Sequence, residues 1–272
     1  MISLDKKTIK QLLASHQTEL SPKLGQNYLV DHRAVASFVA TFVPSDVIIE
    51  IGPGIGTITS AYFKGYKRVI LIELDQTKIP LLQDVLTQAN DGVYPEWVEI
   101  LHEDFLTVDT TALGLEGKTY QVVGALPYNI SKRIIYAILH WYPTPLQCSF
   151  ILQKEVAQKY HADIPDETFL SVSTKLFGST KLGEIFSPGS FYPSPKVSSR
   201  ILIIKDFLAT TLNDIQKKED IATFIRKGFE MPRKKLVNGQ LNVQNMKVRN
   251  LRPQELEKRD WESLFDETTL RT

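Results

Sequence analysis

An apolar strand that ends in a glycine-rich turn constrains the fold of this chain more than any other feature. Residues 47–51, Val-Ile-Ile-Glu-Ile, have the pattern of a buried strand, and Gly52, Gly54 and Gly56 follow at alternate positions. A second apolar run covers residues 68–73, and Asp75 can begin the helix after it. Strands that alternate with helices pair in parallel, because each helix carries the chain back across the sheet. The sequence therefore predicts a mostly parallel α/β sheet with helices on both faces.

This alternation continues to about residue 205. We expect further strands at residues 97–101, 120–125, 146–152, 181–186 and 200–205, and helices at 131–140 and 154–161. Asp31 can cap an earlier helix whose apolar positions are Val35, Phe38, Val39 and Phe42. After residue 205 the strand patterns disappear, and residues 217–229 and 253–265 have helical patterns. We therefore expect a domain over residues 1–205, with an N-terminal segment over 1–30, and a small helical domain over 206–272.

The charge balance excludes several classes of protein. Lys and Arg number 32 and Asp and Glu number 31, so the formal net charge is +1, too low for a polycation that binds nucleic acid by bulk charge. The hydrophobic fraction of 43% is that of a globular protein. The only cysteine, Cys148, lies in an apolar run, so we expect a buried thiol, no disulfide and no cysteine-rich zinc site. The histidines show no paired ligand spacing, and we predict no metal site.

No stretch of the sequence approaches the ~20 apolar residues that a membrane span needs. Residues 1–16 lack the apolar core and the cleavage site of a signal peptide, and they carry Asp5 and no arginine. We therefore expect a soluble, cytoplasmic protein, with a monomer as the default.

The tail is strongly basic. Eight cations face one acid, Glu230, between residues 226 and 252, which gives 8 − 1 = +7. Such a run is often only a solvated face, but it also has the size of a phosphate-binding surface. The cations predicted to contact RNA are Arg226, Lys227, Arg233, Lys234, Lys235 and Arg249; the remaining two of the eight are Lys247 and Arg252.

The glycine turn indicates a cofactor. Glycines there let the backbone approach a ligand closely, and Glu73, at the end of the next strand, is placed to accept the hydroxyl hydrogens of a ribose. Asp104 could accept a hydrogen bond from an adenine amino group while Phe105 packs beside the ring, although an Asp in this position is often only a cap. The spacing G-x-G-x-G, in place of G-x-G-x-x-G, suits S-adenosylmethionine, which has no phosphate. An unliganded turn and a nicotinamide-dependent dehydrogenase remain alternatives.

Residues 122–131, Val-Val-Gly-Ala-Leu-Pro-Tyr-Asn-Ile-Ser, closely resemble the N-L-P-Y-N-I-S acceptor motif of the ribosomal RNA adenine N6-dimethyltransferases. Other motifs of that family are matched in order by residues 24–29 (LGQNYL), 152–157 (LQKEVA) and 191–199 (FYPSPKVSS), and loosely by 224–236 and 248–264. The chain looks more like the small-subunit branch than like the macrolide-resistance methylases of the large subunit.

This resemblance implies a Rossmann-like, S-adenosylmethionine-dependent methyltransferase sheet with a small C-terminal helical domain, acting on small-subunit ribosomal RNA or on a partly assembled small subunit. It implies that Tyr128 and Phe191 stack on the two faces of a target adenine that has left its RNA stack. The cofactor-binding residues that it implies, together with the glycine turn, are Gln26, Asn27, Leu29, Gly52, Gly54, Gly56, Glu73, Leu74, Asp104, Phe105 and Ala125. The catalytic residues that it implies are Ala125, Leu126, Pro127, Tyr128 and Phe191.

Ala125 departs from the family pattern, which has Asn at this position. In the family, that Asn and a backbone carbonyl beside the proline accept the two amino hydrogens of the adenine, and Ala125 has no side-chain acceptor. Loss of one positioned polar group at a reacting centre typically costs ~3 kcal/mol, or ~10²-fold in rate. Three interpretations follow: a weak or inactive homologue that binds RNA as a ribosome-assembly factor, a deliberately disabled variant, or slow turnover supported by a carbonyl and a water.

Overall fold

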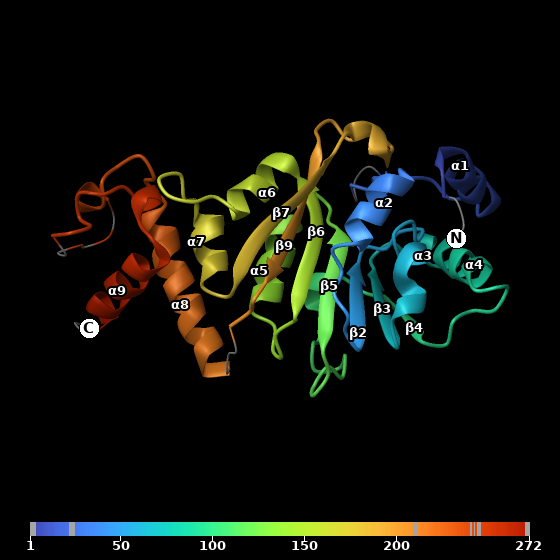
Figure 1. Cartoon of the computed structure of the whole chain (residues 1–272), viewed down its shortest axis with the longest axis horizontal. Coiled ribbons are helices and arrows are strands. Elements are labelled where there is room, and N and C mark those ends of the chain that lie inside the picture. Colours follow the sequence, from blue (N-terminus) through green and yellow to red (C-terminus); the bar gives the residue numbers. More distant parts are fainter. Residues whose placement is uncertain are drawn as a thin grey trace.

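The computed structural model describes residues 4–21, 25–208, 212–239, 241, 243 and 246–269. Its centre is a seven-stranded sheet in the order β4-β3-β2-β5-β6-β9-β7 (Figure 1). The strands of this sheet are β2 (Val47–Ile51), β3 (Arg68–Glu73), β4 (Val98–His102), β5 (Tyr120–Ala125), β6 (Gln147–Gln153), β7 (Ser179–Phe186) and β9 (Ser199–Lys205).

The first five strands of the sheet are parallel to one another, and of the last two only β9 runs in the opposite direction. β2 pairs in parallel with β3 and β5, β3 with β4, and β5 with β6, whereas β9 runs antiparallel to both β6 and β7. The chain passes from β7 to β9 through a 3₁₀ turn and the short β8, without an α-helix, and a connection of this kind suits antiparallel strands. The carboxyl ends of β2, β3, β4 and β5 therefore meet at one edge, as the predicted α/β sheet requires.

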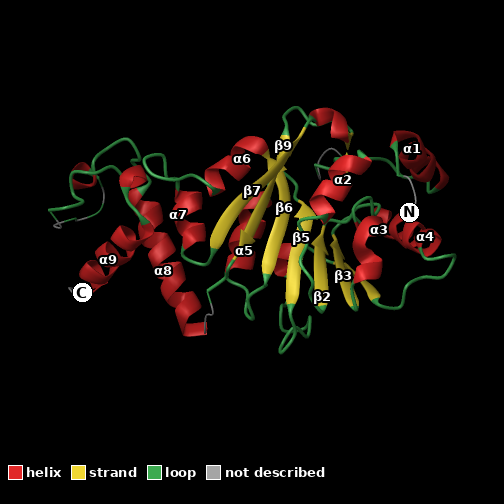
Figure 2. Cartoon of the chain, in the orientation of Figure 1, coloured by secondary structure: helices red, strands yellow, loops and turns green. Residues whose placement is uncertain are grey.

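Helices cover both faces of the sheet. They are α1 (Lys6–Ser15), α2 (His32–Val39), α3 (Thr59–Tyr62), α4 (Ile79–Ala89), α5 (Ser131–Leu139), α6 (Lys154–Tyr160), α7 (Phe169–Lys175), α8 (Leu212–Gly228) and α9 (Lys258–Thr269). Apolar side chains of α2, α3 and α4 pack with Ile48, Val69 and Leu71, and those of α5 pack with Ile49 and Ile70, which face the other way. Figure 2 shows α2 and α3 on the near side of the sheet and α5 behind it.

A two-stranded ribbon ties the N-terminal segment to the loop after β7. β1 (Tyr28–Leu29) pairs antiparallel with β8 (Phe191–Tyr192), in the register Tyr28 with Tyr192 and Leu29 with Phe191. Leu24, the first residue of one of the family-like motifs, lies outside the described residues. The ribbon holds residues 25–29 beside the carboxyl edge of the sheet.

Most predicted elements are present, but α1, β1 and β8 were not predicted, and three further helices differ from expectation. Asp31 caps α2, as expected, and its Oδ1 accepts a hydrogen bond from Arg33 N at 2.9 Å. α8 begins at Leu212, earlier than predicted, and α9 begins only at Lys258, after a 3₁₀ turn over Pro253–Glu255. α7 was not predicted, because its sequence FLSVSTK is rich in residues that favour strands or caps.

At the end of the molecule opposite the N-terminus, α8 packs against α7 and α9 packs against α8 (Figure 1). Trp261 of α9 is fully buried, and a Cβ atom on Gly228 of α8 would lie 2.4 Å from its ring. The buried Ile225 and Trp261 belong to the same apolar cluster as α5 and α7. The tail is therefore joined to the sheet by a continuous core, and the domain limits drawn from the sequence remain predictions.

Candidate active site

A cavity of about 240 Å³ lies at the edge of the sheet where β2, β3, β4 and β5 end. In α/β proteins this edge is where ligands bind. The cavity is lined by the N-terminal segment, the turn after β2, the end of β3, the chain after β4 and the connection from β5 to α5. The lining residues are 25–29, 50–54, 57, 58, 72–74, 103–106, 125, 127, 129, 130, 133 and 134.

The glycine turn forms the floor of this cavity. Gly52 and Gly54 have φ angles of +63° and +58°, in the left-handed region that favours glycine. A Cβ atom on Gly54 would lie 2.4 Å from the ring of Tyr28, so only glycine fits between the turn and the N-terminal segment. Gly54 N donates a 2.8 Å hydrogen bond to Oε2 of Glu73, which fixes the turn against β3.

Glu50, at the end of β2, is a buried acid in the cavity wall that the sequence prediction did not include. Its Oε2 accepts hydrogen bonds from Thr59 Oγ1 at 2.6 Å and from the Tyr62 hydroxyl at 2.7 Å. Burial raises the pKa of Glu50 to about 7, although these two hydrogen bonds oppose the shift. The sequence feature that could have identified Glu50 is a charged residue in an otherwise apolar strand, directly before the glycine turn.

The cavity lining is strongly acidic. Glu73 is 6% exposed and accepts a hydrogen bond from Asp75 N at 2.8 Å as well as the one from the glycine turn. Burial raises the pKa of Glu73, against the effect of these N–H donors. Together with Glu50, Glu103 and Asp104, it makes four carboxylates in the lining, against one cation, Arg133. Such a cavity favours a ligand that carries positive charge.

Asp104 is both a helix cap and a cavity residue. Its Oδ1 accepts a hydrogen bond from Leu106 N at 2.9 Å and caps the 3₁₀ turn Phe105–Thr107. The buried ring of Phe105 stacks on Trp141 with 5.0 Å between ring centroids, and both Asp104 and Phe105 line the cavity. Asp104 can therefore cap the turn with Oδ1 and still bind a ligand with Oδ2, since no described residue hydrogen-bonds to Oδ2.

The N-terminal segment closes one side of the cavity. Gln26 donates from Nε2 to Oδ2 of Asp75 at 2.7 Å, and Asn27 donates to a backbone carbonyl within its own segment. Both residues line the cavity, as does Leu74, which is 47% exposed. The hydroxyl of Tyr28 is buried and has no hydrogen-bond partner among the described residues. That unsatisfied hydroxyl, in the wall of a cavity, fits a site that receives a polar ligand.

The family-like motif follows β5. Ala125 and Pro127 line the cavity, and Asn129 lines it from an exposed position. The Pro127 carbonyl accepts a hydrogen bond from Ser131 N at the start of α5, so it is engaged in the turn. No hydrogen bond in the described part of the chain engages the Leu126 carbonyl, whereas the Leu126 side chain is 2% exposed and packs in the core. Leu126 itself does not line the cavity, so only its unpaired backbone carbonyl is left as a candidate for contact with a ligand.

Three predicted site residues lie differently from expectation. Gly56 does not line the cavity, and a Cβ atom there would lie 2.8 Å from Leu82 of α4, so this glycine serves helix packing. Phe191 is 2% exposed, pairs with Leu29 and does not line the cavity, so its role as a clamp on a target base stays a prediction. Tyr128 is half-buried, does not line the cavity, and its hydroxyl is 2.8 Å from Ser199 Oγ.

The predicted RNA-contacting cations lie away from this cavity, on the tail. Lys227, Arg233, Lys234 and Lys235 are exposed. Arg249 is half-buried, and its guanidinium donates to the sulfur of Met246. Arg226 is exposed at the end of α8, with its guanidinium over two aromatic rings. None of these six cations lines the cavity.

Cys148 is fully buried in β6, as predicted. Among the described residues, no three or more His, Cys, Asp or Glu side chains come together as metal ligands. In the same part of the chain, no helix is both long and apolar enough to cross a membrane.

The chain is similar in sequence to proteins of known name. The sequence profile of a family described as "Ribosomal RNA adenine dimethylase" matches residues 17–268. Ribosomal RNA small subunit methyltransferase A of Alkaliphilus oremlandii is 32% identical over 244 residues, 87% of this chain and 82% of that protein. The protein of the same name from Clostridium perfringens is 33% identical over 238 residues, 86% of this chain and 81% of its own.

Two solved structures have a similar fold. A dimethyladenosine transferase from Plasmodium falciparum superimposes with a TM-score of 0.72 at 20% identity, over 88% of this chain and 96% of that one. The 23S rRNA methyltransferase ErmE superimposes with a TM-score of 0.65 at 22% identity, over 88% and 98%. The predicted methyltransferase-like α/β fold is thereby confirmed.

Proposed function

This chain belongs to the ribosomal RNA adenine dimethylase family, and on that premise we propose that it dimethylates adenine N6 in small-subunit ribosomal RNA with S-adenosylmethionine as methyl donor. The relatives from Alkaliphilus oremlandii and Clostridium perfringens both carry the small subunit in their names. ErmE, a large-subunit enzyme by its name, resembles this chain in fold alone. These names favour the small-subunit branch over the macrolide-resistance type.

The acidic cavity at the carboxyl edge of the sheet is the observation that carries this proposal. Four carboxylates against one cation favour a sulfonium and an ammonium group, and they disfavour the phosphates of a dinucleotide. When bound, S-adenosylmethionine supplies an electrophilic methyl group. In our proposal the backbone of Gly52 and Gly54 gives close approach, Glu73 accepts from the ribose, and Asp104 accepts from the adenine amino group.

On the acceptor side, the chain itself must orient the target amino group. That nitrogen is a poor nucleophile, because its lone pair is delocalised into the ring, so placement of its two hydrogens matters more than a strong base. We assign one acceptor to the Leu126 carbonyl, which has no other partner among the described residues. Ala125, at the second acceptor position, offers only a methyl group, so the amino group is held on one side alone. The ring of Tyr128 remains the proposed stacking partner of the base.

The remaining parts of the proposal concern the partner. We propose that the exposed cations of the tail contact phosphates, and that the substrate is a partly assembled small subunit. We further propose that the chain acts as a monomer, in the cytoplasm, where such subunits are present. The family membership and the cations of residues 226–249 support this assignment.

The test is transfer of labelled methyl groups from S-adenosylmethionine to undermethylated small ribosomal subunits, with the chain compared with its Ala125→Asn variant. Restoring the missing acceptor is expected to raise kcat about 100-fold, since one positioned polar group at a reacting centre contributes that much. Equal rates would show that Ala125 does not impair the enzyme. In parallel, titrations with S-adenosylmethionine and with a nicotinamide dinucleotide should give binding of the first only.

Ala125 also favours a second candidate function, that of a catalytically weak RNA-binding factor in ribosome assembly. This alternative predicts tight, salt-sensitive binding to small subunits with no methyl transfer by the unmodified chain. Binding without transfer, together with recovered transfer in Ala125→Asn, would establish it. Absence of both binding and transfer would contradict both functions.

A further inference from the structure

A groove of about 880 Å³ lies between α5, the chain around α6 and α7, and the part of the tail at and after the end of α8. It adjoins the active-site cavity, because Leu106 and Arg133 line both. Figure 1 shows α7 between α6 and α8 at this end of the molecule. The groove is thus built partly from the sheet domain and partly from the basic tail.

The rim of the groove is positively charged. Lys132, Arg133 and Lys159 are exposed, and in the described part of the chain no ion pair or hydrogen bond engages their side chains. Arg226 adds a fourth cation from α8. The carboxylates in the lining are those of Asp166 and of one buried glutamate that is already paired. The rim therefore presents a cation excess to any ligand.

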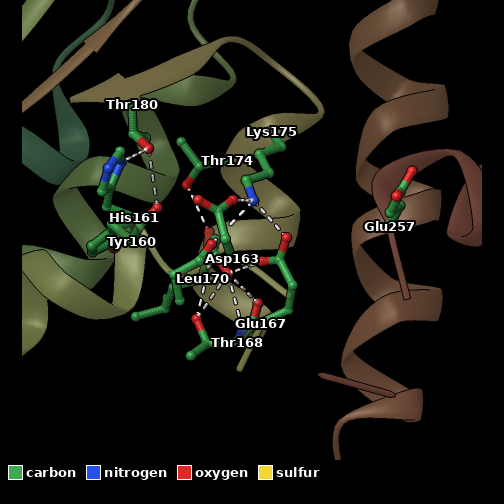
Figure 3. A network of polar contacts seen from close by, with 12 residues as sticks. Tyr160, His161, Asp163, Glu167, Thr168, Leu170, Thr174, Lys175, Thr180 and Glu257 are labelled. Atoms are coloured by element: carbon green, nitrogen blue, oxygen red, sulfur yellow. Dashed lines mark hydrogen bonds and ion pairs between the residues drawn. The ribbon is translucent and has the colours of Figure 1, made fainter. Parts of the chain in front are cut away.

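Glu167 is that glutamate, and it shares one cation, Lys175, with a second carboxylate, Asp163. Lys175 Nζ lies 2.5 Å from Oε1 of Glu167 and 2.6 Å from Oδ1 of Asp163, and Ser171 also donates a hydrogen bond to Glu167 (Figure 3). The backbone N–H of Glu167 donates a hydrogen bond to the carbonyl of Gln254 in the tail. The network fixes the wall of the groove, and Lys175 offsets one of its two negative charges, which lowers the repulsion that the pair of carboxylates would exert on a phosphate.

Aromatic rings line the groove behind the cations. The Arg226 guanidinium lies 5.1 Å from the ring centre of Phe169 and 5.9 Å from that of Tyr136, and Phe229 completes the apolar surface. Tyr136 and Phe169 are both half-buried, so part of each remains accessible. Aromatic faces beside a guanidinium, with lysines at the rim, are the features that bind an unstacked base and its phosphates.

We propose that this groove binds a nucleotide of the substrate RNA other than the adenine that is methylated. The inference rests on the proposed function for the identity of the polymer. Three observations support it: the cation excess, the aromatic lining, and the shared wall with the active-site cavity. Arg226 also belongs to the basic tail, so the groove connects the cations of the tail with the active site. Lys132, Lys159 and Tyr136 thereby become RNA-binding residues.

The test is equilibrium binding of the full chain, saturated with S-adenosylmethionine, to undermethylated small subunits over a range of salt concentrations. The double variant Lys132→Gln/Lys159→Gln is compared with Lys67→Gln/Lys118→Gln, which removes the same charge from the exposed opposite edge, just before β3 and β5. We expect about tenfold weaker binding and a salt slope lower by about 1.5 for the groove variant only, since each phosphate contact contributes ~0.7 to ~0.9. Equal losses in the two variants would overturn the groove proposal.

A second pair of variants tests the aromatic part. Tyr136→Leu removes the ring and should weaken subunit binding about tenfold, whereas Tyr136→Phe keeps the ring and should stay within about twofold. Unaltered affinity for S-adenosylmethionine shows that both variants are folded. A weaker cofactor affinity with unchanged subunit binding would assign the groove to the cofactor and contradict us. If the unmodified chain fails to bind subunits at all, the proposed function itself fails, an outcome distinct from equal behaviour of groove and control variants.

Discussion

Four carboxylates and one guanidinium line the active-site cavity, whereas residues 226–252 carry eight cations and one carboxylate. The cavity residues are held by short hydrogen bonds among buried groups, such as Gly54 N to Glu73 at 2.8 Å. The tail cations mostly stand in solvent. A net charge of +1 therefore combines two surfaces of opposite charge. We propose that the acidic cavity binds a cationic cofactor through the geometry of its lining, and that the basic tail binds RNA through the number of its cations.

Two glycines make this comparison testable, because each has a ring 2.4 Å from the position of its missing Cβ. Gly54 abuts Tyr28 at the cavity, and Gly228 abuts Trp261 in the tail. The same substitution at the two sites should therefore affect different functions.

The largest effect is expected for Gly54→Ala. The left-handed φ costs ~1 to 2 kcal/mol for a non-glycine residue, and relief of the clash with Tyr28 adds a similar cost. Affinity for S-adenosylmethionine, measured by calorimetry, should fall at least ~100-fold. Gly117→Ala is the control, since Gly117 has a φ of +69° but nothing within 4 Å of its Cβ position. If both variants bind the cofactor equally well, close approach at the turn is unimportant.

Gly228→Ala should leave cofactor affinity unchanged and act on the tail. The added methyl group must push Trp261 out of a fully buried position, at a cost of ~1 to 3 kcal/mol, or a fall in Tm of roughly 2 to 8 °C. Subunit binding should weaken about tenfold, because the basic residues move with α8 and α9. Gly65→Ala, with open space around its Cβ position, is the matched control. A loss of cofactor binding in Gly228→Ala would show that the two regions are not separable.

The sequence predicted which edge of the sheet holds the cavity better than it predicted which side chains line the cavity. The bounds of β2, β3 and β5 coincide with the predicted strands, because strands buried on both faces appear as continuous apolar runs. Spacing alone could not separate Gly54, which faces the ligand space, from Gly56, which faces α4. The buried side of Phe191 depends on its pairing with Leu29, 162 residues away in the chain.

The tail was harder to predict for a related reason. α7, on which α8 packs, begins at a capping box formed by Thr168 and Ser171 and is braced by the ion pair of Glu167 with Lys175. These contacts compensate for weak local helix propensity, so tertiary structure decides this helix. The groove beside α7 brings together side chains from three separate stretches of the chain, so no local sequence motif predicts it.

Glu50 should give the cavity a pH dependence that the tail lacks. In the folded protein burial raises its pKa from 4.5 to about 7. The unfolded chain then loses this proton first as pH rises, so the group lowers the stability of the free protein between about pH 4.5 and 7, and its destabilising effect persists above that range. A cationic cofactor prefers the ionised form, so affinity should fall about tenfold per pH unit below 7. Glu50→Gln should flatten that profile in a binding titration from pH 5.5 to 8. A parallel profile in both proteins would remove Glu50 from the cofactor site.

The smallest effect is expected for Lys234→Gln/Lys235→Gln, two exposed cations just after α8. If the affinity of the tail for RNA comes from the number of its phosphate contacts, each lysine contributes little alone. The double variant should then bind subunits about fivefold more weakly, and its salt slope should be lower by up to ~1.8. Cofactor affinity should be unchanged, because neither residue lines the cavity. Lys67→Gln/Lys118→Gln again controls for net charge. If the variant still binds subunits more weakly at high salt, these lysines act through the fold of the tail and not through phosphate contacts. In that case the basic tail, like the acidic cavity, depends on the precise placement of its residues, and the contrast between the two surfaces is wrong.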